Sequence, residues 1–226
     1  MADFLLLYDQ VSEYSKKDID KGQTPLDIYT ICCAIREGFC LSYSIRKDNT
    51  LYFFLKKTNC LVKLEGRRLR YLGSDERSQA LLFGKALDKL KGINSKESPW
   101  VKSTPGIYVR TFPSYNTFLR FMHDMTNKNL VLIFDTISAF DVPFLAHTYD
   151  YPNIKPVKKI ENLEEKFFIL SEEKSPLIDF IHQFVQIYPQ IVEKMILTPL
   201  KRIEKIEDKI LYINFQIDQQ RLPIQS

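Results

Sequence analysis

The stretch Lys102-Ser103-Thr104-Pro105-Gly106-Ile107-Tyr108-Val109-Arg110 lies near the middle of the chain and joins a turn-forming tetrapeptide to a β-prone run. Pro105 fixes φ and Gly106 frees it, so the backbone can bend tightly here. In the run that follows, Tyr108 and Arg110 occupy alternate positions and are expected to face outward. Taken alone, the stretch predicts a turn that leads into a strand.

The composition is that of a globular protein. The chain has 226 residues, of which 45% are hydrophobic and 27% charged, enough to bury a core in one domain or two small ones. The formal net charge of +4 permits an RNA partner but does not demand one. No apolar run is long enough to span a bilayer, and the N-terminal residues do not form a signal peptide. We therefore expect a soluble, cytoplasmic protein without a membrane partner.

Several common sites are missing from the sequence. The cysteines form no C-x-x-C pair and are expected to be buried free thiols: Cys32, Cys33, Cys40 and Cys60. The three histidines are far apart and lack metal-ligand spacing, so no metal site is predicted. With 7 glycines, the chain contains no G-x-G-x-x-G, no G-x-x-x-x-G-K-[ST] and no G-x-S-x-G motif. These absences argue against a Rossmann dinucleotide site, a P-loop and a hydrolase nucleophile elbow.

The remaining pattern predicts an α/β protein. Strands are expected at residues 3–9, 51–55, 60–64, 67–72, 130–134, 166–170 and 195–197. Helices are expected at residues 28–39, 74–90, 116–125 and 177–187, with a closing helix through residue 215, and loops at 16–23, 94–99 and 138–162. Thr24 and Ser74 are the expected N-caps of the first two helices. Because strands alternate with helices in the second half, we expect a mostly parallel sheet covered by helices on both faces.

Four blocks of sequence resemble one known family. They are Leu26-Asp27, Leu41-Ser42 with Ile45-Arg46-Lys47-Asp48, Asp75-Glu76-Arg77, and residues 103–110 (STPGIYVR). In this order and spacing they resemble the archaeal tRNA (pseudouridine-54) N1-methyltransferases of the SPOUT superfamily. The second half of the chain matches that family more weakly.

The resemblance implies a single SPOUT methyltransferase domain over residues 1–226. Its N-terminal half (1–100) would carry an extra hairpin and RNA-facing residues, and its C-terminal half (101–226) a trefoil knot, which is a rare exception to unthreaded folds. S-adenosylmethionine would bind in loops after successive strands, and the active form would be a homodimer. The implied cofactor residues are Ile133, Phe134, Ser171, Leu197, Thr198, Pro199, Leu200, Lys201 and Arg202.

The chain departs from the family in this cofactor region. Ser171 stands where the family has glycine, Glu172-Glu173 open a tract that contains glycine in the family, and Glu207 replaces a cysteine. A glycine beside a cofactor usually lets the backbone approach closely. A serine there either binds through its hydroxyl and backbone amide or crowds the pocket.

Methylation of N1 of pseudouridine requires the ring nitrogen to be held in line with the methyl donor and its proton to be removed. Carboxylates accept from ring N–H groups, and guanidinium groups donate to the carbonyls. The candidate catalytic residues are Asp27, Arg46, Asp48, Asp75 and Arg77, with Asp75 as the candidate base. The alternative interpretation is structural, since Asp27 and Asp75 occupy helix starts and the arginines suit surface ion pairs.

The densest basic cluster is Arg67, Arg68 and Arg70, with Tyr71 beside it. We expect it to contact the phosphates of a folded tRNA arm whose target base is turned out of its loop; the alternative is a charged strand edge. Ser103 and Tyr108 are further candidates for substrate contact. Two other functions remain open: a relative that binds structured RNA without the cofactor, and a methyltransferase for a pseudouridine of ribosomal RNA.

Overall fold

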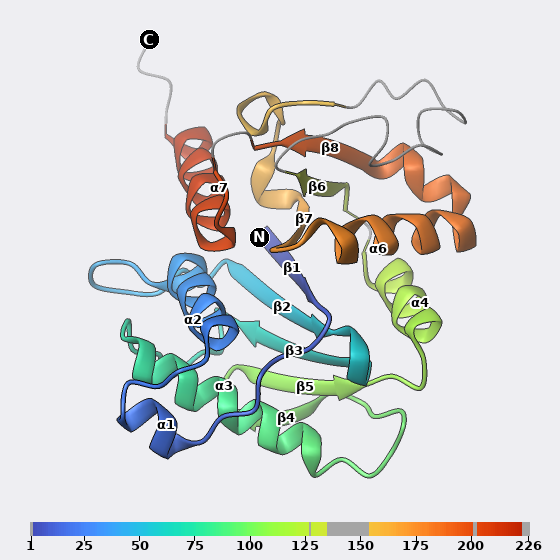
Figure 1. Cartoon of the computed structure of the whole chain (residues 1–226). Helices are drawn as coiled ribbons and strands as arrows, with labels where there is room; N and C mark the ends of the chain where they lie inside the picture. The colour runs from blue at the N-terminus through green and yellow to red at the C-terminus, as the bar shows by residue number, and fades with distance from the viewer. Residues whose placement is uncertain (1, 127, 135–153, 201–202, 223–226) are drawn as a thin grey trace.

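A single sheet of eight strands, in the order β4-β5-β3-β2-β1-β7-β6-β8, organises the molecule (Figure 1). The computed structural model describes residues 2–126, 128–134, 154–200 and 203–222. The strands are β1 (Ala2–Tyr8), β2 (Asn49–Leu55), β3 (Cys60–Glu65), β4 (Val101–Thr104), β5 (Ile107–Thr111), β6 (Leu130–Phe134), β7 (Phe167–Ser171) and β8 (Met195–Pro199). Except for residues 67–72, every run predicted as a strand is one.

The strands β2, β1, β7, β6 and β8 are parallel neighbours, which confirms the mostly parallel sheet. Leu7 lies opposite Ser171, and Phe134 lies opposite Pro199. The carboxyl ends of β1, β6, β7 and β8 therefore meet at one edge, which we call the carboxyl edge. Open α/β sheets bind ligands at such edges.

The β3, β5 and β4 strands extend the sheet in antiparallel pairing. The KSTPGIYVR stretch forms the β4–β5 hairpin, and Gly106 at its turn has φ +83°, a conformation that suits glycine. Along β5, Ile107 and Val109 are buried while Tyr108 and Arg110 are half-buried. The predicted turn, strand and alternation are thus confirmed.

Helices cover both faces of the sheet. On one face lie α1 (Lys16–Asp20), α2 (Leu26–Phe39), α3 (Glu76–Lys91) and α7 (Ile206–Arg221); on the other lie α4 (Tyr115–Met125) and α6 (Lys174–Ile187). Short 3₁₀ turns occur at Lys56–Thr58, Val157–Lys159, Leu163–Glu165 and Pro189–Lys194. Successive residues of a strand face opposite sides, so Phe4 packs under α2 and α7 while Leu5 packs under α4 and α6.

Two segments differ from their predictions. The loop expected at residues 16–23 contains α1, whose start is fixed by the Ser15 amide donating to Asp18 Oδ2 at 2.8 Å. Residues 67–72, predicted as a strand, form a loop because Arg68 and Leu69 turn back to the Glu65 carbonyl instead of pairing along β3.

The predicted N-caps shift by one residue. Asp75 rather than Ser74 caps α3, since its Oδ1 accepts from the Ser78 amide at 2.8 Å. Pro25 rather than Thr24 precedes α2. In both cases the helix itself was predicted.

The predicted trefoil knot and most of the 138–162 excursion depend on residues 135–153 and 201–202, which lie outside the described residues. Where the description resumes, Ile154 forms a parallel bridge to Leu197 of β8. The Lys155 amide also donates to the Leu197 carbonyl at 3.0 Å.

Candidate functional site

The structure brings the predicted cofactor residues together at the carboxyl edge. Ile133 and Phe134 end β6, Ser171 ends β7, and residues 197–199 end β8. The Leu200 amide donates to the Phe134 carbonyl at 2.7 Å, which holds the chain after β8 against the end of β6. Lys201 and Arg202 lie outside the described part of the chain.

Ser171 is used by the fold itself. Its hydroxyl donates to the Leu7 carbonyl at 3.1 Å, across the gap between β7 and β1, and the residue is 6% exposed. The side chain therefore turns along the sheet toward β1. What Ser171 offers to a ligand is its backbone rather than its hydroxyl.

Two buried hydroxyls at the same edge have no hydrogen-bond partner among the described residues: Tyr8 OH and Thr198 Oγ1. Thr198 is fully buried and Tyr8 is 6% exposed. A buried hydroxyl without a partner carries an uncompensated desolvation cost of about 1–3 kcal/mol. A polar ligand at this edge would supply the missing hydrogen bonds.

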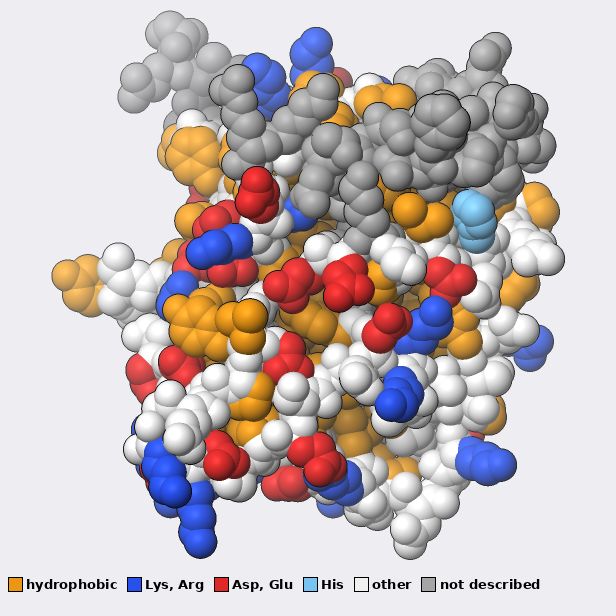
Figure 2. All heavy atoms as spheres, in the orientation of Figure 1, with side chains coloured by type: hydrophobic (Ala, Val, Ile, Leu, Met, Phe, Trp, Pro, Cys, Tyr) orange, Lys and Arg blue, Asp and Glu red, His pale blue; other side chains and the backbone are white. Residues whose placement is uncertain are grey.

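The charges of three carboxylates act on the Tyr8 hydroxyl, and we call these residues the acid cluster. They are Asp27 of α2, Glu172 after β7 and Glu207 of α7. Burial first, and then the negative charges of the acid cluster, raise the pKa of Tyr8. Figure 2 shows acidic side chains gathered near the middle of this face, between the α2 and α7 side and the start of α6.

The carboxylates of the acid cluster repel one another. Burial raises the pKa of the Glu172 carboxyl, and Glu207, Glu173 and Asp27 raise it further. The ammonium of Lys209, which is 1% exposed, opposes that rise. The cluster therefore favours the binding of positive charge.

The sequence predicted Asp27 as a site residue but did not indicate Tyr8. Glu172 and Glu207 stood out only as differences from the family. Tyr8 is the last residue of a buried strand, which is the position where parallel strands present side chains to a ligand. The place of Tyr8 at the end of a predicted strand was the sequence signal that could have identified it. Asp27 is held in place by the Ser12 amide, which donates to its Oδ2 at 2.5 Å.

Three of the other candidate catalytic residues, Arg46, Asp48 and Asp75, lie at the opposite end of α2 from Asp27. The Arg46 amide donates to the carbonyl of Phe39, the last residue of α2, and the helix places that residue ~18 Å from Asp27. Arg46 Nη1 donates to Asp218 Oδ1 of α7 at 2.7 Å, and Asp48 Oδ2 lies 3.6 Å from Arg221 Nη2.

Asp75 belongs to the same distant end, whereas Arg77 lies beside α1. Asp75 caps α3, and Gln79 of that helix lies with its Nε2 3.9 Å from the Cys40 thiol, just after α2. Arg77 Nε donates to Asp20 Oδ1 at 2.9 Å, and Asp20 is the last residue of α1. Within one protomer, the contacts of Arg46, Asp48 and Asp75 hold these three side chains at the end of α2 that is away from Asp27.

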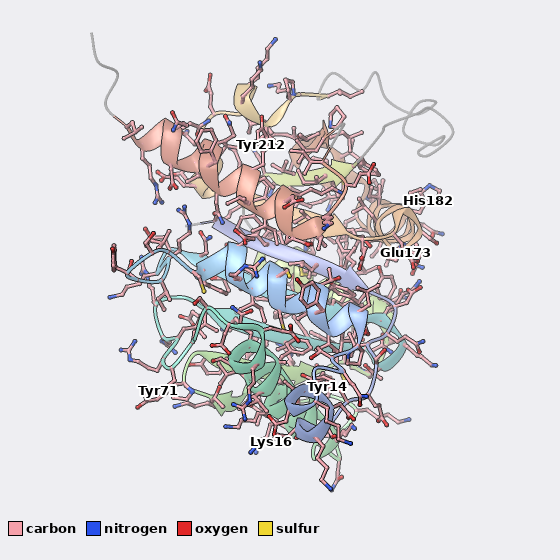
Figure 3. The ribbon with its side chains drawn as sticks, turned by 60° about the vertical axis from the view of Figure 1, so that its left-hand side comes forward. Tyr14, Lys16, Tyr71, Glu173, His182 and Tyr212 are labelled. Carbon is pink, nitrogen blue, oxygen red and sulfur yellow. The ribbon has the colours of Figure 1, made fainter. Side chains whose placement is uncertain are left out.

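The basic loop after β3 also lies at this distant end. Arg67, Arg68 and Arg70 are exposed, and Tyr71 is 87% exposed with φ 62°. Arg68 Nη1 donates to Tyr108 Oη at 3.3 Å, which joins the loop to β5 near Ser103. In Figure 3, Tyr71 and Glu173 lie at opposite sides of the molecule.

A cavity of about 960 Å³ opens between α1, α3 and the strand ends near Cys60 and Phe112. Tyr14 and Lys16, which line it, lie side by side on the lower part of Figure 3. Ser12 lines it too and contacts Asp27, so the cavity adjoins the acid cluster through that residue.

Among the described residues, no group of three or more His, Cys, Asp or Glu side chains is arranged to hold a metal ion. In the same part of the chain, no helix combines the length and apolar character needed to cross a membrane.

Comparison with known proteins decides the family. Residues 9–133, more than half of the chain, match the family described as putative SAM-dependent RNA methyltransferases. The chain belongs to this family. The resemblance that the four sequence blocks carried is thereby confirmed.

Relatives in this family are named tRNA (pseudouridine(54)-N(1))-methyltransferase. The protein from Methanocaldococcus jannaschii is 31% identical over 120 residues, which cover 51% of this chain and 58% of that protein. The protein from Pyrococcus abyssi is 35% identical over 103 residues, covering 43% of this chain and 50% of the relative. The protein from Haloferax volcanii is 28% identical over 160 residues, covering 71% and 68%. The chain thus spans about half of the first two relatives.

Proposed function

We propose that this protein is a cytoplasmic tRNA (pseudouridine-54) N1-methyltransferase that uses S-adenosylmethionine. Family membership and the names of its relatives support the reaction. The observation that carries the proposal is the carboxyl edge, where two buried hydroxyls beside the predicted cofactor loops have no hydrogen-bond partner among the described residues. The SPOUT trefoil knot belongs to this proposal, because the family resemblance implies it.

The residues at the carboxyl edge fit the cofactor. When bound, S-adenosylmethionine supplies an activated methyl group. The ends of β6, β7 and β8 would hold it through backbone groups of Ile133, Phe134 and Ser171, through the Thr198 hydroxyl, and through the chain from Leu197 to Arg202. The acid cluster lies beside them and complements a positively charged ligand.

Asp27 is the candidate catalytic residue whose charge acts on the Tyr8 hydroxyl at this edge. Its carboxylate can accept a ring N–H and orient the base for in-line transfer. Arg46, Asp48 and Asp75 lie at the far end of α2, whose last residue is ~18 Å from Asp27, and Arg77 lies beside α1. We propose that they reach the same base across a homodimer rather than within one protomer.

An exposed apolar face supports such a homodimer. On α2, Leu26 and Tyr29 are 78% and 43% exposed, and on α7, Leu211 and Phe215 are 49% and 53% exposed. The two helices lie side by side in Figures 1 and 3. A two-fold axis across this pair would set the far end of one protomer beside the carboxyl edge of the other.

The RNA would be held at the basic loop. Arg67, Arg68 and Arg70 are exposed and can contact phosphates, and Ser103 and Tyr108 lie on the neighbouring hairpin. Replacing the three arginines with glutamine is expected to weaken binding of all folded RNAs and to reduce its salt dependence.

A methyl-transfer assay tests the proposed function. Purified protein, S-adenosylmethionine and a tRNA T-arm carrying pseudouridine 54 should yield N1-methylpseudouridine, detected by mass spectrometry of nucleosides. The same arm with uridine 54 is the control and should not react. If the protein methylates only a fragment of small-subunit ribosomal RNA, its substrate is ribosomal RNA rather than tRNA.

A second candidate function is RNA binding without catalysis. It is favoured by Ser171 and by the acidic Glu172-Glu173 tract, which replace the glycine-containing loop of the family. Titration calorimetry with S-adenosylmethionine separates the two. Absence of binding, together with retained T-arm binding, would establish the RNA-binding protein and exclude the methyltransferase.

A further inference from the structure

The Tyr8 hydroxyl marks a site that the sequence did not predict. Tyr8 is 6% exposed, its hydroxyl has no partner among the described residues, and the charges of the acid cluster, Asp27, Glu172 and Glu207, act on it. The elements that supply these side chains are β1, α2, the β7–α6 connection and α7. The buried hydroxyl therefore lies in a negative field that three other parts of the chain supply.

The cluster is short of positive charge. Burial raises the pKa of the Glu172 carboxyl most, and repulsion from Glu207, Glu173 and Asp27 raises it further. The Lys209 ammonium opposes it, yet Glu172 still titrates above its ordinary range. A bound cation would relieve this repulsion, whereas a neutral ligand of the same shape would not.

In the proposed reaction, the methyl donor and the product that it becomes differ in charge. S-adenosylmethionine carries a positive sulfonium, and the product, S-adenosylhomocysteine, has a neutral thioether at the same place. The amino acid and adenosine parts are identical in the two molecules. A negative field at the sulfur therefore distinguishes them without any difference in shape.

We propose that the acid cluster around Tyr8 makes the cofactor site select the cationic sulfonium over the neutral thioether, so that the product is released after transfer. This inference rests on the proposed function, because it assumes that S-adenosylmethionine binds at the carboxyl edge. It assigns binding roles to Tyr8, Glu172 and Glu207.

Calorimetric titration of the protein with each ligand, without RNA, tests the inference. Glu172→Gln and Glu207→Gln should each lower the affinity for S-adenosylmethionine about fivefold and leave that for S-adenosylhomocysteine within about twofold. Glu193→Gln, which removes the same charge from an exposed residue of the Pro189–Lys194 turn, should leave both affinities unchanged. Tyr8→Phe should weaken both ligands alike, since it removes a hydroxyl and no charge.

The pH dependence supplies a second readout. Protonation of Glu172 removes its charge, so the preference for the sulfonium should decline as the pH falls through the raised pKa of this group. In Glu172→Gln that part of the decline should disappear. The other charged groups that act on Glu172, which are Glu207, Glu173, Asp27 and Lys209, remain in both proteins.

The outcomes separate this inference from the proposed function. Wild-type protein that binds neither ligand overturns both. Wild-type protein that binds both ligands, with the same affinity ratio in Glu172→Gln, Glu207→Gln and Glu193→Gln, overturns the selection by charge and leaves the methyltransferase standing. Methylation of the T-arm by these variants is then the independent measure of the proposed function.

Discussion

Gly106 is the residue on which the β4–β5 hairpin depends. Its φ is +83°, and a Cβ there would lie 2.4 Å from the Leu69 amide nitrogen and 2.5 Å from Leu69 Cα. The turn therefore needs glycine both for its backbone conformation and for the close approach of the loop after β3. Pro105 and Gly106 indicated the bend, but only the fold shows what approaches it.

Gly106→Ala is expected to lower the free energy of unfolding by about 2–4 kcal/mol, because it combines a strained φ with a backbone clash. Gly22→Ala is the control: its φ is +69°, yet nothing lies within 4 Å of the added Cβ, so the loss should be about 1 kcal/mol. Urea denaturation followed by circular dichroism measures both. Equal losses would show that the contact with Leu69 is unimportant.

The Arg46–Asp218 pair predicts a pH-dependent contribution to stability. Arg46 holds the pKa of Asp218 below its ordinary value. A group with a depressed folded-state pKa stabilises the protein above the unfolded value and loses that contribution as the pH falls through the folded value. Since the Asp218 side chain is 44% exposed, the contribution should be only ~0.2–1 kcal/mol.

Asp218→Asn should therefore lower Tm slightly at pH 7, and the difference from wild type should shrink as the pH approaches 3. Asp9→Asn, at an exposed residue after β1, is the matched control and should leave Tm unchanged. Thermal scans between pH 3 and 7 give the result. A difference that grows toward low pH would contradict the stabilising role of the pair.

At the scale of elements, Asp75 has one established role and one proposed role. As the N-cap of α3 it accepts a hydrogen bond from the Ser78 amide at 2.8 Å, and as a candidate base it would act on the target nucleoside. Asp75→Ala should cost about 0.5–2 kcal/mol of stability, whereas Asp75→Asn should retain most of it because asparagine also caps helices. Ser74→Ala is the control and should change little.

Methyl transfer by Asp75→Asn then isolates the chemical role. If Asp75 acts on the base, this variant should fold normally and lose activity, since its amide cannot take a proton. A variant with wild-type stability and full activity would leave Asp75 as a helix cap alone. The comparison needs single-turnover rates, so that product release does not mask the transfer step.

The elements that the sequence predicted well are those whose pattern is set by burial. The apolar runs ending at Phe134 and Ser171 became strands because they are buried on both faces, and the helix over residues 28–39 was found for the same reason. The α1 helix was missed because it buries only Ile19. Residues 67–72 were wrongly predicted as a strand. Their conformation depends on hydrogen bonds to the Glu65 carbonyl, and the hydrophobic pattern of the sequence does not indicate such bonds.

At the scale of the whole molecule, the site is assembled by the parallel topology. Residues 8, 27, 172 and 207 are far apart in the chain and meet because successive parallel strands end at one edge. The sequence predicted where the strands end, and the family resemblance indicated that cofactor residues follow them. Neither showed that three acids act on Tyr8, or that Asp75 and Asp27 lie at opposite ends of α2. Both facts follow from the arrangement of the elements.

Because of that separation, the site as proposed depends on the proposed homodimer. Leu211→Glu combined with Phe215→Glu places two charges on the exposed apolar face of α7, where they would be buried against a second copy. The double variant should be monomeric by light scattering, with an unchanged circular dichroism spectrum, and should lose methyl transfer if the far end of one protomer serves the other. Ile187→Glu, at the end of α6 on the opposite face and 40% exposed, should remain dimeric and active. A wild-type protein that methylates its substrate as a monomer would instead require Asp27 and the acid cluster to act without Arg46, Asp48, Asp75 and Arg77.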